Sequence, residues 1–208
     1  MSASRFRPSD IVFLDKDGTL ITNVPHSVNC DLITLAPGAA DALRTFAGAG
    51  LDVAVVSNQP GVAFGRFTEG ALDAVRDRLA EMIAPFGVRL RAFYYCPHHP
   101  AGTVSRYAVE CQCRKPQCGL LLRASAELDV DLARSWMVGD ILDDVEAGRR
   151  AGCRTVLVNN GGETEWVQGP LRQPDVVARD LAAAARAIVG WSEPARSDAL
   201  FTPNAERM

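Results

Sequence analysis

Short apolar runs alternate with amphipathic stretches along most of this chain. Each run is bounded by polar or turn residues, which is the pattern of a strand buried on both faces of a parallel sheet. We predict strands over residues 11–14, 51–56, 89–95, 133–138 and 155–158, and a short edge strand over 175–178. Strands that alternate with helices in this way are typical of an α/β fold with a central, mostly parallel sheet.

Apolar residues at helical spacing fill the intervals between these strands. They predict helices over residues 37–49, 68–86, 117–128 and 143–152, and an alanine-rich helix that ends near Val189. The polar residues from Ile21 to Asp31 predict a loop over the carboxyl edge of the sheet. Because no internal repeat is visible, we expect residues 1–190 to form one domain without a large cap, followed by a flexible tail over 191–208.

The first strand ends in two aspartates, within the sequence Asp15-Lys16-Asp17-Gly18-Thr19. Because ligands of open α/β sheets bind beyond the carboxyl ends of strands, both aspartates would stand at the mouth of the sheet. Two carboxylates so close together repel each other unless a cation lies between them, and Mg²⁺ prefers such oxygen ligands. The sequence Asp-x-Asp-Gly is also compatible with an ordinary solvated turn.

Polar residues also follow the second and fourth strands. Ser57 and Asn58 could hold a phosphate oxygen and a substrate group, although Ser-Asn before Pro-Gly also makes an ordinary turn. Asp140 could complete the Mg²⁺ site, and Asp144 could hold either a metal-bound water or Lys115. The ends of three strands would therefore contribute to one site.

A cysteine-rich loop follows the third strand. Cys96 and His98 form one pair, and Cys111 and Cys113 form a second pair across the loop. Four ligands of this kind match a closed tetrahedral zinc site, and the metal would order a polar loop that buries little apolar surface. His99 could replace His98 as a ligand. Reduced thiols or a disulfide of Cys96 are the alternatives to zinc.

Arg114 and Lys115 come directly after this loop. If zinc fixes the backbone up to Cys113, the two cations have little freedom left. A lysine close to the aspartates would neutralise charge on a transferring phosphoryl group. In isolation, two adjacent basic residues are more often solvated, but their place beside the cysteine loop favours a role at the site.

The composition narrows the classes of function. The chain has 208 residues, of which 48% are hydrophobic, enough for one substantial core. A net charge of -3 and an isoelectric point of 5.6 argue against a protein that coats nucleic acid. We find no apolar stretch of about 18 residues and no secretory signal over residues 1–10. We therefore expect a cytoplasmic monomer with neither nucleic acid nor membrane as a partner.

In order and placement, the strand-end motifs resemble those of the haloacid dehalogenase superfamily of phosphohydrolases. They are Asp15-Lys-Asp17-Gly-Thr19, Ser57-Asn58, Lys115, and Gly139-Asp140 with Asp144. The sequences Ser-Asn-Gln-x-Gly, Cys-Pro-His-His-Pro and Cys-x-Cys-Arg-Lys-Pro further resemble its zinc-containing branch, which holds phosphatases of heptose bisphosphate and of histidinol phosphate. The resemblance spans residues 11–158 and implies a three-layer, Rossmann-like fold.

The resemblance also implies a role for each motif residue. Asp15 would be the nucleophile that forms an aspartyl phosphate, and Asp17 would be the general acid and then the general base. Ser57 and Lys115 would hold the phosphoryl oxygens. Asp15, Asp140 and the backbone carbonyl of Asp17 would bind Mg²⁺.

The same resemblance assigns the structural zinc and the substrate contacts. The zinc ligands would be Cys96, His98, Cys111 and Cys113. A small phosphorylated sugar would contact Asn23, His26, Asn58, Gln59 and Arg114. The planar guanidinium of Arg114 suits a second phosphate, because it can pair with two oxygens at once.

Three positions depart from the pattern of the heptose enzymes. Ile141 stands where Lys is usual, Phe64 stands where Arg is common, and Pro60 also differs. Fewer cations would weaken the binding of a doubly phosphorylated sugar. The expected reaction is hydrolysis of the C7 phosphate of D-glycero-D-manno-heptose 1,7-bisphosphate. Histidinol phosphate or another small phosphomonoester is the alternative substrate, and a catalytically idle, zinc-stabilised binding protein is the second alternative.

Overall fold

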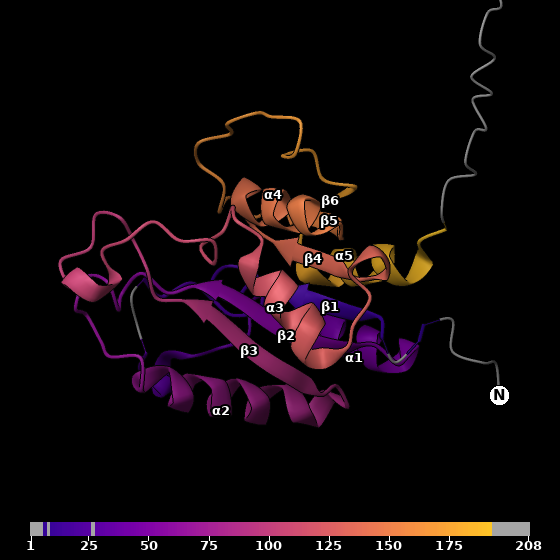
Figure 1. Ribbon diagram of the computed structural model, residues 1–208. Helices are drawn as coiled ribbons and strands as arrows, with labels where there is room; N and C mark the ends of the chain where they lie inside the picture. Colours follow the sequence, from indigo (N-terminus) through magenta and orange to yellow (C-terminus); the bar gives the residue numbers. More distant parts are fainter. Residues whose placement is uncertain (1–5, 8, 26–27, 193–208) are drawn as a thin grey trace, which may run out of the picture.

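The strands of this chain form one parallel sheet, shown in the computed structural model of Figure 1. The structure describes residues 6–7, 9–25 and 28–192. Within them the sheet has six strands in the order β3-β2-β1-β4-β5-β6, and every neighbouring pair is parallel. The strands are β1 (Ile11–Leu14), β2 (Asp52–Asn58), β3 (Leu90–Cys96), β4 (Trp136–Gly139), β5 (Arg154–Val158) and β6 (Val176–Ala178). The α/β prediction is confirmed, including the short edge strand.

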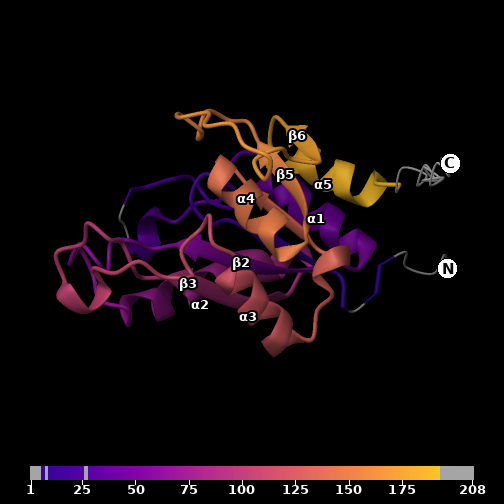
Figure 2. The ribbon, with the colours of Figure 1, turned by 45° about the horizontal axis from the view of Figure 1, so that its top comes forward.

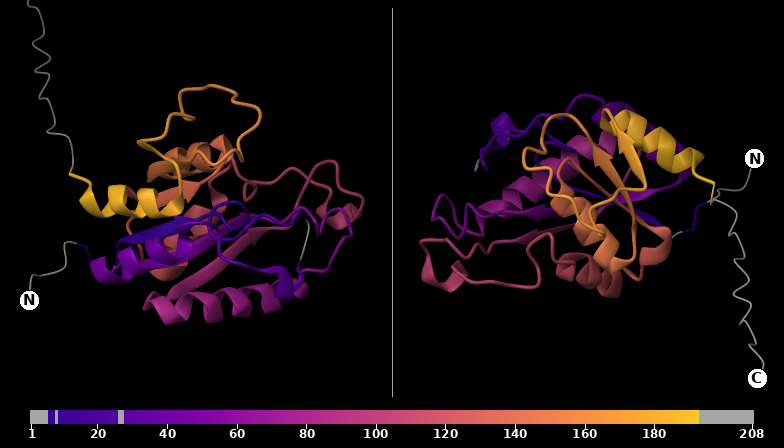
Figure 3. Two further views of the ribbon diagram at one scale, coloured as in Figure 1. Left: turned by 180° about the vertical axis from the view of Figure 1, so that it is seen from behind. Right: turned by 90° about the horizontal axis from the view of Figure 1, so that it is seen from above.

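Helices cover both faces of the sheet and make three layers. The helices are α1 (Ala39–Ala49), α2 (Ala71–Ile83), α3 (Gly119–Leu128), α4 (Leu142–Ala151) and α5 (Leu181–Gly190). The apolar sides of α1, α2 and α5 join the core on one face, and those of α3 and α4 pack on the other face. Figure 1 shows α3 and α4 on the near face of the sheet. The left panel of Figure 3, seen from behind, shows α1 and α5 side by side on the opposite face.

Strand β1 lies in the middle of the sheet and is buried on both sides. Val12 and Leu14 belong to the core beneath α1 and α5, whereas Ile11 and Phe13 belong to the core beneath α3. None of the four is more than 1% exposed. Burying each such side chain contributes about 1.5–3 kcal/mol. The backbone that leads into Asp15 is therefore among the most firmly packed in the molecule.

Several boundaries differ from those that the pattern predicts. Strand β2 continues to Asn58, so Ser57 and Asn58 belong to the strand and not to the turn after it. Strand β4 begins at Trp136, because Leu132–Arg134 form a 3-10 turn in which the Ala133 amide donates to the Asp131 side chain. These shifts leave Asp15, Ser57 and Asp140 at the carboxyl edge of the sheet.

The cysteine loop between β3 and α3, residues 97–118, projects beyond the carboxyl ends of β2 and β3 (Figure 2). At the other end of the chain, Trp191 packs edge-on against Trp136, with ring centroids 5.2 Å apart. Residues 193–208, most of the predicted tail, lie outside the described residues. Among the helices that are described, none combines the length and the hydrophobicity needed to cross a membrane.

Candidate active site

Three acidic side chains meet where β1 and β4 end. Asp15 directly follows β1, Asp140 directly follows β4, and Asp144 lies in the first turn of α4. Because β1 and β4 are paired neighbours, carboxylate oxygens of the three residues lie within 4.8 Å of one another. The exposed fractions are 7%, 6% and 0%, so water screens their mutual repulsion poorly. Such a cluster requires cations to remain ionised.

The ammonium group of Lys115 is one such cation. Its Nζ lies 2.5 Å from Asp15 Oδ1 and 2.6 Å from Asp144 Oδ1, and it donates to the carbonyl oxygen of Val56 at 2.9 Å. Lys115 is only 2% exposed, so these protein oxygens, and not bulk water, surround its ammonium group. One ammonium group cannot neutralise three carboxylates.

The shortage of positive charge is visible in the pKa values. Burial, together with the charges of Asp15 and Asp144, raises the pKa of Asp140 to about 8. Burial raises the pKa of Asp144 to about 7 although the charge of Lys115 opposes it, and burial likewise raises the pKa of Asp15. Burial lowers the pKa of Lys115, but the nearby charges of Asp144 and Asp15 outweigh it and hold the pKa above its usual value. A second cation would allow all three carboxylates to ionise at neutral pH.

We expect the stability of the protein without Mg²⁺ to fall as the pH rises from about 5 to 8. The pKa values of Asp140 and Asp144 are about 8 and about 7 in the folded chain and roughly 4 when it unfolds, so the folded state holds the extra protons in that range. The thermal midpoint should therefore decrease with pH, and added Mg²⁺ should raise it most at pH 8. A midpoint that rises over this range without Mg²⁺ would contradict the electrostatic account.

A glycine lets the first strand turn close beside Asp140. Gly18 has φ +87°, and a Cβ atom there would lie only 2.2 Å from Asp140 Oδ2. The Thr19 hydroxyl donates to Asp140 Oδ1 at 3.4 Å. The carboxylate oxygens here have too few cations around them. Hard ions such as Mg²⁺ bind to oxygen ligands of this kind. The aspartate cluster therefore fits Mg²⁺.

Asp17 is held at the mouth of the site by two neighbouring side chains. Lys16 Nζ lies 2.5 Å from Asp17 Oδ1, and Gln59 Nε2 donates to Asp17 Oδ2 at 3.1 Å. Gln59 Nε2 also donates to Ser57 Oγ at 2.8 Å. Because the Ser57 oxygen accepts that bond, its own proton is free to be donated to a phosphate. Gln59 thus links the hydroxyl of Ser57 to the carboxylate of Asp17.

Asn58 has a partner other than the substrate that the resemblance implies. Its Oδ1 accepts from the Lys115 backbone amide at 3.0 Å, and its Nδ2 donates to the Lys115 carbonyl at 3.1 Å. These two bonds attach the backbone of Lys115 to the end of β2. Contact of Asn58 with substrate stays a prediction, whereas its hold on Lys115 is direct.

The remaining expected substrate contacts do not converge on one point. Arg114 is half-buried, with Nη1 3.5 Å from the His98 carbonyl, and it lines a pocket of about 660 Å³ together with Lys115. Asn23 is exposed and lines a different pocket of about 370 Å³ beside Asp140. His26 lies outside the described residues.

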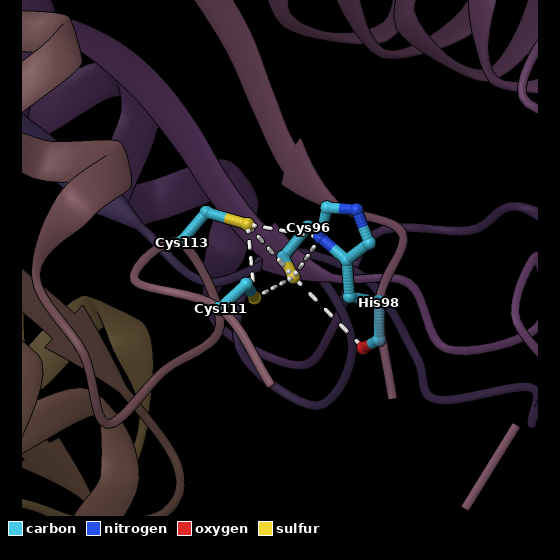
Figure 4. Close-up of side chains that lie close together, drawn as sticks. All are labelled: Cys96, His98, Cys111 and Cys113. Carbon is cyan, nitrogen blue, oxygen red and sulfur yellow. Dashed lines mark hydrogen bonds between the residues drawn. The ribbon is translucent and has the colours of Figure 1, made fainter. Parts of the chain in front are cut away.

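The four expected zinc ligands point toward one another (Figure 4). The three sulfur atoms of Cys96, Cys111 and Cys113 are 3.1–3.5 Å apart. His98 Nδ1 lies 3.3 Å from Cys113 Sγ and 3.7 Å from Cys96 Sγ. In a tetrahedral site with Zn–S and Zn–N bonds of about 2.3 and 2.0 Å, ligand atoms are roughly 3.5–3.8 Å apart. The cluster therefore fits zinc with only a small adjustment.

Two further observations count against a disulfide and in favour of a thiolate that could bind a metal. All its cysteines are free thiols, so Cys96 forms no disulfide. Hydrogen bonds, above all from Cys96, lower the pKa of Cys113 to about 5 despite its burial, which favours the thiolate that a metal requires. His99 lies outside the cluster: its Nδ1 accepts from the Ala101 amide, and its ring contacts Phe64 at 4.9 Å.

Sequence reasoning missed two supports of the site. Glu69, before α2, accepts hydrogen bonds from the hydroxyls of Tyr95 and Tyr107, and so ties the cysteine loop to β3 and α2. Lys16 is 2% exposed and lies against Asp17, as described above. The place of Lys16 between the two aspartates was a usable signal. Nothing local indicates the partners of Glu69, because they lie in distant segments.

Comparison with known proteins agrees with this geometry. A family model described as HAD-hydrolase-like matches residues 112–184. D-glycero-beta-D-manno-heptose-1,7-bisphosphate 7-phosphatase of Yersinia pestis is 37% identical over 179 residues, which cover 85% of this chain and 94% of that protein. The protein of the same name from Escherichia coli K12 is 41% identical over 153 residues, or 72% of this chain and 79% of that protein.

A solved structure extends the comparison to three dimensions. The D,D-heptose 1,7-bisphosphate phosphatase of B. bronchiseptica, crystallised with magnesium and phosphate, matches with a TM-score of 0.68 and 30% identity. The match covers 86% of this chain and 98% of that one. The parallel sheet, the aspartates at its edge and these similarities define a phosphatase of the haloacid dehalogenase class. Within that class, the chain belongs to the family of the D-glycero-D-manno-heptose-1,7-bisphosphate 7-phosphatases.

Proposed function

We propose that this chain hydrolyses the C7 phosphate of D-glycero-D-manno-heptose 1,7-bisphosphate and leaves the phosphate at C1 in place. The observation that carries the proposal is the buried contact between Asp15 and Lys115 at the end of β1, beside Asp140. A carboxylate in that place can attack phosphorus while the ammonium group neutralises the phosphoryl oxygens. The names of relatives that align over most of the chain support the choice of sugar.

In the first half of the reaction, an oxygen of Asp15 attacks the phosphorus of the C7 phosphate. The bond from phosphorus to the sugar oxygen breaks, and Asp17 gives its proton to that oxygen. Ser57 Oγ and Lys115 Nζ hold the phosphoryl oxygens in line with the leaving group. The products of this half are the heptose 1-phosphate and an aspartyl phosphate on Asp15.

In the second half, Asp17 takes a proton from a water molecule that attacks the same phosphorus. The bond between phosphorus and Asp15 then breaks, so that inorganic phosphate leaves and both carboxyl groups return to their first state. Gln59 holds the carboxylate of Asp17 in place for both proton transfers, since it donates to Asp17 Oδ2.

The residues that would hold Mg²⁺ are Asp15, Asp140 and the backbone carbonyl of Asp17. When bound, Mg²⁺ supplies positive charge that neutralises the phosphoryl group and the crowded carboxylates. Cys96, His98, Cys111 and Cys113 would hold a structural zinc ion that fixes the loop leading to Lys115.

Phosphate release from both anomers of heptose 1,7-bisphosphate and from histidinol phosphate, measured with Mg²⁺, tests the choice of substrate. We expect kcat/KM for one bisphosphate anomer to exceed that for histidinol phosphate by more than about a hundredfold, or roughly 2.7 kcal/mol. Arg114 provides the charge for the second phosphate, so Arg114→Gln should reduce this preference mainly through KM. If histidinol phosphate were the better substrate, the sugar would be the wrong choice although the chemistry would stand.

We also propose that the chain acts as a cytoplasmic monomer whose partner is a small phosphorylated sugar. The isoelectric point of 5.6 supports the exclusion of nucleic acid, because an acidic surface repels phosphate backbones.

A further inference from the structure

We propose that Asn160 and Gly162, in the loop after β5, are positioning residues that hold Asp140 in place for Mg²⁺. Neither residue lies in the motifs that carry the chemistry above. The inference rests on the proposed function in one respect, because it takes Asp140 as a ligand of the metal.

Gly162 leaves space that the carboxylate of Asp140 fills. A Cβ atom at position 162 would lie 2.0 Å from Asp140 Oδ2, 2.7 Å from its Cγ and 3.1 Å from its Cβ. Rotation of the carboxylate alone could not relieve this clash, because the whole side chain is in the way. A Cβ at Gly18 would meet the same Oδ2 at 2.2 Å. Asp140 is therefore confined by two glycine backbones.

Asn160 connects those two backbones. Its Nδ2 donates to the Gly18 carbonyl at 2.6 Å, and its Oδ1 accepts from the Gly162 amide at 3.0 Å. One side chain thus joins the turn after β1 to the turn after β5, although 142 residues separate Asn160 from Gly18. The two turns meet because the strands are parallel, which places all their carboxyl ends at one edge of the sheet.

The same residues border an open space next to Asp140. Gly18, Asp140, Asn160 and Gly162 all line the pocket of about 370 Å³ described above. This space can admit a hydrated ion. Mg²⁺ demands near-octahedral geometry with bonds of about 2.0–2.1 Å, so a ligand displaced by a few tenths of an ångström binds it poorly. Added bulk at position 162 should therefore lower metal affinity without disturbing the core.

Gly162→Ala is the direct test, and Gly169→Ala is its matched control. A Cβ at Gly169 would come no closer than 3.9 Å to any atom, whereas the one at Gly162 would collide with Asp140. Each full-length protein would be titrated with Mn²⁺, with the free-ion EPR signal as the measure of binding, and Mg²⁺ would then compete. We expect Gly162→Ala to raise both dissociation constants by about tenfold or more, and the control to stay within about twofold.

Asn160→Ala provides a second variant that introduces no clash. The lost hydrogen bonds should weaken metal binding by about fivefold, the equivalent of roughly 1 kcal/mol. The thermal midpoint and the zinc content of each variant, measured without Mg²⁺, show whether it is folded. If Gly162→Ala does not fold, the metal affinity of Asn160→Ala tests the inference instead.

The results distinguish a failure of the positioning roles of Asn160 and Gly162 from a failure of the Mg²⁺ site itself. A wild-type protein that binds neither ion would refute the Mg²⁺ site itself, and this inference with it. A wild-type protein that binds Mg²⁺, with both variants within twofold of it, would overturn only the roles of Asn160 and Gly162. Weaker binding by Gly162→Ala and Asn160→Ala, with the Gly169→Ala control unchanged, would support them.

Discussion

Asp15→Asn should reduce phosphate release from the preferred substrate by at least about a thousandfold, the scale observed when a catalytic nucleophile is removed. Asparagine keeps the shape of the side chain but lacks the negative charge that attacks phosphorus. It also relieves the crowding of carboxylates in which burial raises the pKa of Asp15. The variant should therefore fold and be at least as stable as the wild type while losing kcat. Phosphate release and the thermal midpoint, measured together, check both expectations.

Asp143→Asn is a suitable control for that experiment. Asp143 lies in the first turn of α4, one position before Asp144, but it pairs with Arg172 at 2.6 Å. Its loss should leave kcat within about twofold, because its carboxylate lies outside the aspartate cluster and pairs with Arg172, not with Lys115. If the wild type and Asp15→Asn were equally inactive on every phosphate ester tried, the chain would be a zinc-stabilised binding protein and not an enzyme.

Cys113→Ser should remove zinc and destabilise the protein. Serine is a poor zinc ligand, and a loop held mainly by a metal loses its order when the metal leaves. A loss of about 4 kcal/mol would lower the thermal midpoint of a chain of this size by roughly 8–16 °C. Because Lys115 follows Cys113 by two residues, kcat should fall as well. Elemental analysis for zinc, thermal unfolding and phosphate release provide the three measurements.

Cys118→Ser gives the matched comparison. Cys118 is half-buried at the start of α3 and lies outside the metal cluster. The Cys118→Ser protein should retain about one zinc ion per chain and the thermal midpoint of the wild type. A Cys113→Ser protein that kept its zinc and its thermal midpoint would disprove the structural site, whatever its activity.

Much of the fold could be predicted because its signals are local. The apolar run Ile11–Leu14 followed by aspartates identified a central strand with a site at its end, and the structure has that strand in the middle of a parallel sheet. The predicted ends of strands and helices were less accurate where a 3-10 turn adjoins the element. The 3-10 turn bonded by Asp131 delays β4, and Pro85 lies in the 3-10 turn that follows α2, so the predicted helix ends early.

The chemistry of the site was also visible in short motifs, but their contacts were not. The Lys115 ammonium group contacts Asp15, 100 residues away in the sequence. The Asn58 side chain hydrogen-bonds to the backbone of Lys115, 57 residues away. Such pairs depend on which strands are neighbours and how loops return. A motif states that a carboxylate, an ammonium group and a hydroxyl are present, but it does not state that Asn58 bonds to Lys115.

The order of residues alone was therefore sufficient for the alternation of strands and helices, for which strands carry the site and for the types of ligand, because strand periodicity, turn residues and metal preferences act within a few positions. Only the folded chain selected His98 over His99 in the cysteine cluster, joined Gln59 to Asp17, and closed Asn160 and Gly162 around Asp140. These choices depend on where segments that are distant in the sequence meet in space. The packing of the whole sheet determines such meetings, and no short stretch of sequence contains them.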